Sequence, residues 1–145
     1  MGEKTQNTNL ASEFHILSCL YRIGANAHLT LGNKKSVDII VEKAGTLLTI
    51  DVKGSKGGPN FIIDNLTKKD ANHFIVFVSF KGKIDDTNHL PEIYIVPSDK
   101  LELTHAELGR KSLIYVSPDN LKRRVNLSSL RKLKEKYKDN WKPFL

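Results

Sequence analysis

The sequence has 145 residues, 39% hydrophobic and 27% charged, with a net charge of +7, which is typical of one soluble globular domain. Its single cysteine, Cys19, excludes an intrachain disulfide, and no apolar run approaches the ~20 residues of a transmembrane helix. Because the first nine residues also lack the apolar centre of a signal peptide, we expect a cytoplasmic protein with no membrane partner.

The first predicted element is a helix that begins after Thr8 or Asn9 and ends near Arg22. Six apolar side chains share one arc of this helix: Leu10, Phe14, Ile16, Leu17, Leu20 and Tyr21. Glu13 falls inside the same arc. A carboxylate is rarely buried without a partner, so Glu13 either reaches solvent at the edge of the stripe or belongs to a site.

Residues 27–31 predict a short strand, and residues 36–53 predict a β-hairpin with Ala44-Gly45 as its two-residue loop. Three apolar pairs then share one face of the hairpin: Val37 with Val52, Ile39 with Ile50, and Val41 with Leu48. The other face holds Asp38 opposite Asp51, with Lys53 two residues further along. A slip of one residue would mix acids and aliphatics on each face, so the pattern favours this register.

In this register the Cβ atoms of Asp38 and Asp51 lie roughly 4.5–5.5 Å apart, and like charges so placed destabilise a sheet. Both strands are apolar enough to be largely buried. We therefore expect a positive charge beside the pair. Lys53 supplies one, as a structural counter-ion or as a catalytic group, and a hard divalent cation such as Mg²⁺ supplies two.

Asp38, followed after twelve residues by Asp51-Val52-Lys53, resembles the signature of the PD-(D/E)XK, or restriction-endonuclease-like, nuclease superfamily. The resemblance covers roughly residues 11–97 and departs from the common pattern at Val37, where many members have proline. It implies an α/β fold with a restriction-endonuclease-like core, in which a mixed sheet of about five strands is flanked by helices.

The same resemblance implies the roles of the site residues. Glu13, Asp38, Asp51 and the Val52 carbonyl would hold one or two Mg²⁺ or Mn²⁺ ions, which polarise the scissile phosphate and activate a water. Lys53 would orient or deprotonate that water, or stabilise the charge on phosphorus. Small resolvase-like members carry a metal-associated Glu on the first helix, which favours the site over the solvent-exposed alternative for Glu13.

After Lys53, residues 54–60 contain three glycines and a proline and predict an irregular loop, either a flexible linker or a close contact with a sugar-phosphate backbone through Lys56. Residues 73–80 predict a central strand, residues 92–97 a further strand, and residues 113–116 a short one. A helix is expected from Ser98 to about Leu108. The last helix begins at Asn126 or Ser128, with a stripe formed by Leu127, Leu130, Leu133 and Tyr137.

The excess positive charge lies in residues 121–145, which hold nine Lys and Arg against two acidic residues, while the remainder is neutral. Such a segment fits a phosphate-backbone partner, although a solvated helix face has the same composition. The candidate nucleic-acid-binding residues are Lys34, Lys35, Lys56, Lys68, Lys69, Arg131, Lys132 and Lys136.

We therefore expect one PD-(D/E)XK nuclease-like domain over residues 1–145, with a basic C-terminal helix at about 126–139, that hydrolyses DNA with Mg²⁺ or Mn²⁺. A chain this small that cuts both strands of a duplex is expected to act as a homodimer. One alternative is a catalytically inactive nucleic-acid-binding module of the same fold. Another is an interaction protein whose basic tail is solvated. The histidines show no zinc-ligand spacing.

Overall fold

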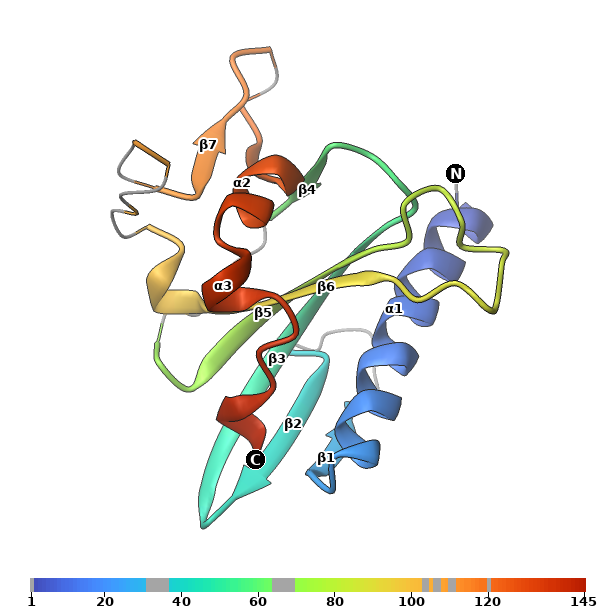
Figure 1. Cartoon of the computed structure of the whole chain (residues 1–145), viewed down its shortest axis with the longest axis vertical. Helices are drawn as coiled ribbons and strands as arrows, with labels where there is room; N and C mark the ends of the chain where they lie inside the picture. Colours follow the sequence, from blue (N-terminus) through green and yellow to red (C-terminus); the bar gives the residue numbers. More distant parts are fainter. Residues whose placement is uncertain are drawn as a thin grey trace.

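The computed structural model describes residues 2–30, 37–63, 70–102, 105, 108–109, 112–119 and 121–145. One long helix, α1, packs against a five-stranded sheet in the order β1-β2-β3-β5-β6, and a three-stranded sheet in the order β4-β8-β7 lies beyond one end of it (Figure 1). The main sheet and its helix have these bounds: α1 Gly2–Arg22, β1 Asn26–Leu29, β2 Ile39–Lys43, β3 Thr46–Ser55, β5 His73–Ser79 and β6 Glu92–Pro97. The α/β architecture with a mixed sheet of five strands confirms the fold class.

The strand directions explain why the sheet is mixed. Strands β1, β2 and β3 are antiparallel neighbours, β3 and β5 are parallel, and β5 and β6 are antiparallel. A parallel pair needs a crossover connection, and the chain between β3 and β5 supplies it by passing through β4 (Asn60–Ile62) of the second sheet. The end of β3 is therefore the point at which the chain leaves the main sheet.

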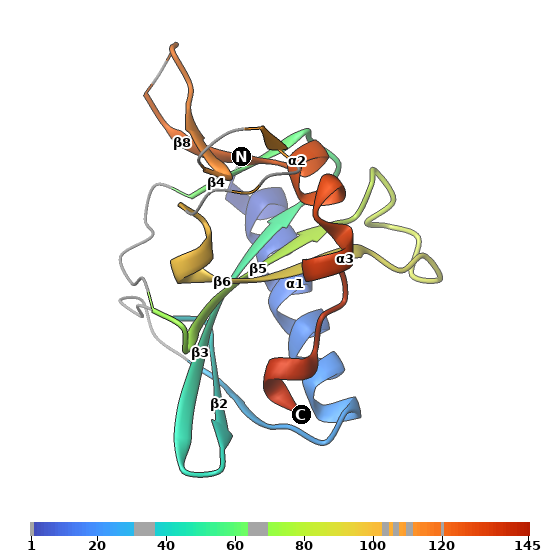
Figure 2. The ribbon, with the colours of Figure 1, turned by 60° about the vertical axis from the view of Figure 1, so that its left-hand side comes forward.

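The β2–β3 hairpin has the predicted register. Ile39 pairs with Ile50 and Val41 pairs with Leu48. The two loop residues, Ala44 and Gly45, have φ values of 51° and 80°, as a two-residue type I′ turn requires. The hairpin turn and the second sheet lie at opposite ends of the molecule (Figure 2).

Two hydrophobic clusters cover the faces of the main sheet. Ile16 and Leu20 of α1 pack with Ile39, Ile50 and Val76 on one face. The other face buries side chains from β5 and β6 against the second sheet and two short helices, α2 (Leu127–Lys132) and α3 (Lys134–Tyr137). The predicted stripe of Leu127, Leu130, Leu133 and Tyr137 is buried in this second cluster. No helix in the described ranges is long and apolar enough to cross a membrane.

Several predicted helix features were wrong in detail. The sheet covers only part of the apolar arc of α1, so Leu10, Phe14 and Tyr21 are 41%, 53% and 56% exposed. The helix expected after Ser98 is a single 3-10 turn, η1 (Ser98–Lys100), and parts of the remaining segment lie outside the described residues. The helix expected at about 126–139 is interrupted at Leu133, whose φ of −107° departs from helical values.

The second sheet was not predicted. Strand β8 (Arg123–Asn126) pairs with β4 on one side and with β7 (Ile114–Val116) on the other. Its sequence, Arg-Arg-Val-Asn, is too short and too charged to show strand periodicity. The loop expected at residues 54–60 also begins later than predicted, because β3 continues through Gly54 and Ser55.

Candidate active site

The candidate site lies where β3 extends beyond the end of its neighbour β2. Residues 51–55 of β3 pair with β5 on one side, whereas the paired residues of β2 begin only at Ile39. Asp38 lies immediately before β2, where its backbone N–H donates to the carbonyl of Ile50 at 2.8 Å. Its carboxylate accepts a hydrogen bond from the Val52 N–H, with 2.7 Å between Oδ2 and N. Asp38 thus satisfies a backbone amide of β3 that β2 no longer reaches, and its side chain is fixed beside Val52 and Lys53.

Gly54 lets α1 approach this part of β3. A Cβ atom at Gly54 would lie 2.0 Å from Ser12 Oγ, 2.9 Å from Ser12 Cβ and 3.3 Å from the Thr8 carbonyl oxygen. No side chain fits in that space. Glu13 follows Ser12 on α1 and is only 8% exposed, so the close approach at Gly54 sets where its carboxylate lies.

A cavity of about 650 Å³ joins these elements. It is lined by Asn9 and Glu13 of α1, by Asp38, and by residues 52–55 of β3 and 60–62 of β4. Four predicted site residues, Glu13, Asp38, Val52 and Lys53, therefore line one cavity.

Asp51 occupies the neighbouring position and does not line the cavity. Its Oδ2 lies 3.3 Å from Nε2 of His73, a fully buried residue at the start of β5. The His73 Nδ1 is 2.7 Å from Thr49 Oγ1. The Nε2–Oδ2 approach does not reach hydrogen-bond geometry, which leaves Nε2 a buried nitrogen without a hydrogen-bond partner. Two carboxylates in the predicted register thus have separate neighbours: the Val52 amide for Asp38 and the His73 ring for Asp51.

The carboxylates of Glu13, Asp38 and Asp51 do not converge on one point. Over the described residues, no group of three or more His, Cys, Asp and Glu side chains is arranged to hold a metal ion. Magnesium, however, is commonly held by only one or two carboxylates together with waters and substrate phosphates. The carboxylates of Glu13 and Asp38 on one cavity are a donor set of this kind.

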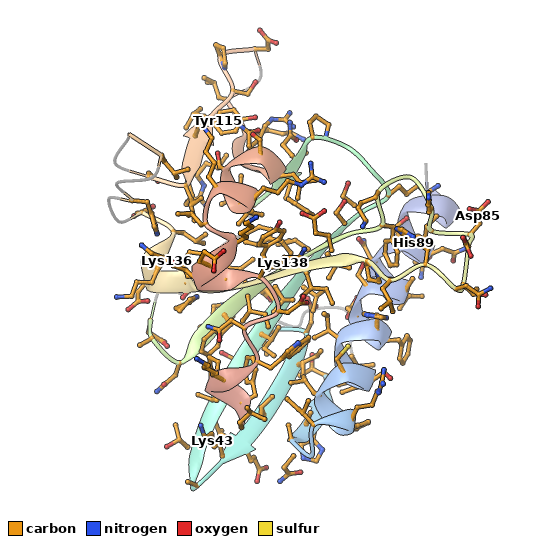
Figure 3. All side chains as sticks on the ribbon, in the orientation of Figure 1. Lys43, Asp85, His89, Tyr115, Lys136 and Lys138 are labelled. Carbon is orange, nitrogen blue, oxygen red and sulfur yellow. The ribbon has the colours of Figure 1, made fainter. Side chains whose placement is uncertain are left out.

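The candidate nucleic-acid-binding residues fall into three groups. Lys34, Lys35, Lys68 and Lys69 lie outside the described residues. Lys56 is exposed directly after β3, and its carbonyl accepts from the Gly82 N–H at 2.5 Å, so the backbone here is tied to a neighbouring turn. Lys132 on α2 is exposed, and so is Lys136 on α3 (Figure 3).

Arg131 has a partner within the protein. Its Nε and Nη2 donate to the two carboxylate oxygens of Glu92, at 2.8 and 2.9 Å. Glu92 also accepts a short hydrogen bond from the Tyr94 hydroxyl. The hydrogen bond from Arg131 is the main reason why the pKa of Glu92 falls to about 2. Arg131 therefore ties α2 to β6, and a DNA contact is not needed to explain its position.

The whole chain aligns with a solved structure of a bacterial homing endonuclease, I-Ssp6803I, over 99% of this chain and 91% of that one, with a TM-score of 0.52 and 19% sequence identity. The fold is therefore similar to that of this endonuclease. No protein-family model and no curated protein matches the sequence. At this level of identity the similarity concerns the fold and not the chemistry of the site.

Sequence reasoning missed three parts of the site: His73 beside Asp51, the side chains of β4, and the role of Gly54. His73 opens an apolar run, and Asp51 lies more than twenty positions earlier in the sequence. Asn60 and Ile62 reach the cavity from a three-residue strand that carries no strong pattern. The glycine was visible, but its function depends on a helix more than forty positions earlier in the chain.

Proposed function

We propose that this protein is a metal-dependent endonuclease of the PD-(D/E)XK type that hydrolyses DNA phosphodiester bonds. The observation that carries the proposal is that Glu13, Asp38 and Lys53 meet on one cavity of about 650 Å³. Two acids and a lysine from three different elements are the groups that phosphodiester hydrolysis needs. The acids bind a cation, and the lysine acts on water or on the charged phosphate.

Glu13 and Asp38 are proposed to hold Mg²⁺ or Mn²⁺, with the Val52 carbonyl as a third oxygen. Asp51 is proposed as a further carboxylate ligand, from its position next to the cavity, where its Oδ2 lies 3.3 Å from His73 Nε2. When bound, the cation supplies Lewis acidity at the scissile phosphate and lowers the pKa of a coordinated water. Asp38 already accepts from the Val52 amide through Oδ2, and this contact fixes its orientation before any ion binds.

Lys53 is proposed to orient the attacking water and to stabilise the negative charge on phosphorus. In the hydrolysis, the water oxygen forms a bond to phosphorus while the bond to the leaving sugar oxygen breaks, and the leaving oxygen takes up a proton. The ammonium of Lys53 would lower the energy of the charged transition state, because it is half-buried on the cavity wall, where a charge interaction is screened less than in bulk water.

The second candidate is a nucleic-acid-binding module that does not cut. It is favoured by the position of Asp51, which faces His73 instead of the cavity, and by the separation of the three acids within the described chain. In this case the cavity acids would be structural, and the protein would bind DNA without a metal requirement.

A cleavage assay on duplex, nicked, flapped and branched DNA, with Mg²⁺, Mn²⁺ or EDTA, separates the two candidates. The nuclease cuts at least one substrate with metal and none in EDTA. Calorimetric titration with Mn²⁺ provides an independent readout, since the nuclease binds the ion and the binding module does not. Glu42→Gln and Lys43→Ala are matched controls for Asp38→Asn and Lys53→Ala, because both lie beside the exposed hairpin turn at the far end of β2.

A further inference from the structure

The second sheet has one buried face and one open face. Phe61, Val125 and Ile114 are cross-strand partners and point into the second hydrophobic cluster. Successive side chains alternate between faces, so the next set of partners, Ile62, Arg124 and Tyr115, points the other way. Ile62 is 44% exposed and the other two are half-buried, so this open face meets solvent.

The open face continues the wall of the cavity. Asn60 and Ile62 line the cavity together with Glu13, Asp38 and Lys53. On the same face Arg124 Nη1 donates to Asn60 Oδ1 at 3.0 Å. The Asn60 amide in turn approaches the Tyr115 hydroxyl at 3.5 Å. A polar row therefore leads from the cavity across β4 and β8 to β7.

The hairpin formed by β7 and β8 extends away from the body of the protein (Figures 1 and 2), and Tyr115 lies on it (Figure 3). Two backbone hydrogen bonds close its end, from the Leu121 N–H to the Ser117 carbonyl at 2.9 Å and from the Ser117 N–H to the Lys122 carbonyl at 3.0 Å. Large apolar side chains are exposed there, with Val116 at 53% and Leu121 at 76%. Exposed apolar side chains therefore stand at the end of this hairpin.

The charge of this hairpin is complementary to a polyanion. Its consecutive residues Lys122, Arg123 and Arg124 carry three positive charges, and Asp119 is the acidic residue between β7 and β8. An exposed apolar tip beside basic side chains matches the two kinds of contact found in a DNA groove. Arginine donates to guanine O6 and N7, and apolar side chains contact the thymine methyl group.

We propose that the β7–β8 hairpin docks in the major groove of duplex DNA next to the cavity, with Arg124 at a base edge and Lys122 at a phosphate. The proposal rests on the proposed function, since the cavity marks where the DNA would be cut. A two-stranded β-ribbon fits the major groove of B-form DNA. The major groove of A-form RNA is too deep and narrow for side chains to read, so the hairpin selects duplex DNA over duplex RNA.

The test is a binding experiment in EDTA, so that cleavage does not interfere. The wild-type protein first selects duplexes from a pool with a randomised 20-base-pair centre, and fluorescence anisotropy then gives Kd for a selected and a scrambled duplex. Arg124→Ala is expected to weaken binding to the selected duplex roughly 5- to 150-fold, and binding to the scrambled duplex much less, because a base contact is lost. Lys122→Ala is expected to weaken both alike and to reduce the slope of log K against log salt by about 0.9.

Arg22→Ala is the matched control. Arg22 is an exposed arginine in the last turn of α1, and it does not line the cavity. Its replacement should leave both affinities within about twofold of wild type. Lys122 is exposed, so Lys122→Ala should keep the fold. It remains a test even if Arg124→Ala disturbs the contacts of Asn60 and Tyr115 on the open face.

Three results would overturn the proposal: wild-type affinities in both hairpin variants, equal affinity of the wild type for duplex RNA and duplex DNA, or no binding to any duplex. Its failure is distinguishable from that of the proposed function. If the protein binds as expected but cuts nothing with Mg²⁺ or Mn²⁺, the docking proposal is supported and the nuclease proposal is refuted. If the protein cuts DNA while both hairpin variants bind with wild-type affinity, the nuclease proposal is supported and the docking proposal is refuted.

Discussion

Replacing Gly54 with alanine tests whether the close contact between α1 and β3 holds the site together. The new Cβ would lie 2.0 Å from Ser12 Oγ and 2.9 Å from Ser12 Cβ, well inside contact distance. Ser12 is fully buried and its hydroxyl donates to the Thr8 carbonyl at 2.8 Å, so it has no space to move away. The helix must shift, and overpacking of this kind costs about 1–3 kcal/mol.

For a domain of this size, that loss lowers the melting temperature by roughly 2–12 °C, at ~2–4 °C per kcal/mol. Gly58→Ala is the control, because a Cβ at Gly58 meets only Ser55 Oγ, at 3.6 Å, and should change stability by less than about 0.5 kcal/mol. The shift of α1 also moves Glu13, so metal-dependent cleavage by Gly54→Ala should fall even at temperatures where the variant is folded.

The double variant Ser12→Gly with Gly54→Ala completes a double-mutant cycle. Glycine in a helix costs about 1 kcal/mol by itself, but it removes the atoms that clash. The double variant should therefore be more stable than the sum of the single changes predicts. Thermal denaturation of the four proteins measures this. A Gly54→Ala variant with wild-type stability and cleavage would refute the reasoning.

The remaining predictions concern side chains around the site. His73→Asn should raise the Mn²⁺ concentration needed for half-saturation about 10- to 100-fold, because outer partners orient ligating carboxylates and His73 is the neighbour of Asp51, a proposed ligand; unchanged calorimetric affinity would exclude this role. Arg131→Ala should destabilise the protein most above about pH 4.5. Glu92 has a pKa lowered from 4.5 to about 2, so the stability that the pair contributes is fully present above 4.5 and is lost as the pH falls toward 2. Urea denaturation from pH 7 to 3 measures this, and a difference between variant and wild type that grows as the pH falls would contradict it.

The hairpin and its register were predictable because they depend on local pattern. Alternation of aliphatic residues with Asp38 and Asp51, and a loop that tolerates positive φ, leave one register that buries the aliphatic side chains. Glu13 was visible for a similar reason, since an acid inside an apolar stripe is unusual, and it is buried on the cavity.

The rest depends on contacts between distant parts of the chain. Strand β8 is stabilised by its two neighbours and by Val125 in the second cluster. Its two arginines interrupt the apolar alternation from which a strand is predicted. The orientation of Asp51 depends on His73, which parallel pairing of β3 with β5 brings alongside. The exposure of Phe14 follows from the width of the sheet that α1 covers, which periodicity in a helix does not specify.

The most direct test of the catalytic proposal compares single-turnover DNA cleavage by wild type, Lys53→Ala and Lys43→Ala on one substrate with saturating Mg²⁺, with DNA affinity measured separately in EDTA. Lys53 lines the cavity with Glu13 and Asp38, whereas Lys43 lies at the hairpin turn with its Nζ 3.2 Å from the Pro143 carbonyl oxygen. We predict that wild type and Lys43→Ala cleave, and that Lys53→Ala loses cleavage at least 100-fold while its DNA affinity stays within about threefold. Equal cleavage by Lys53→Ala and wild type, or no metal-dependent cleavage by wild type, would contradict the account.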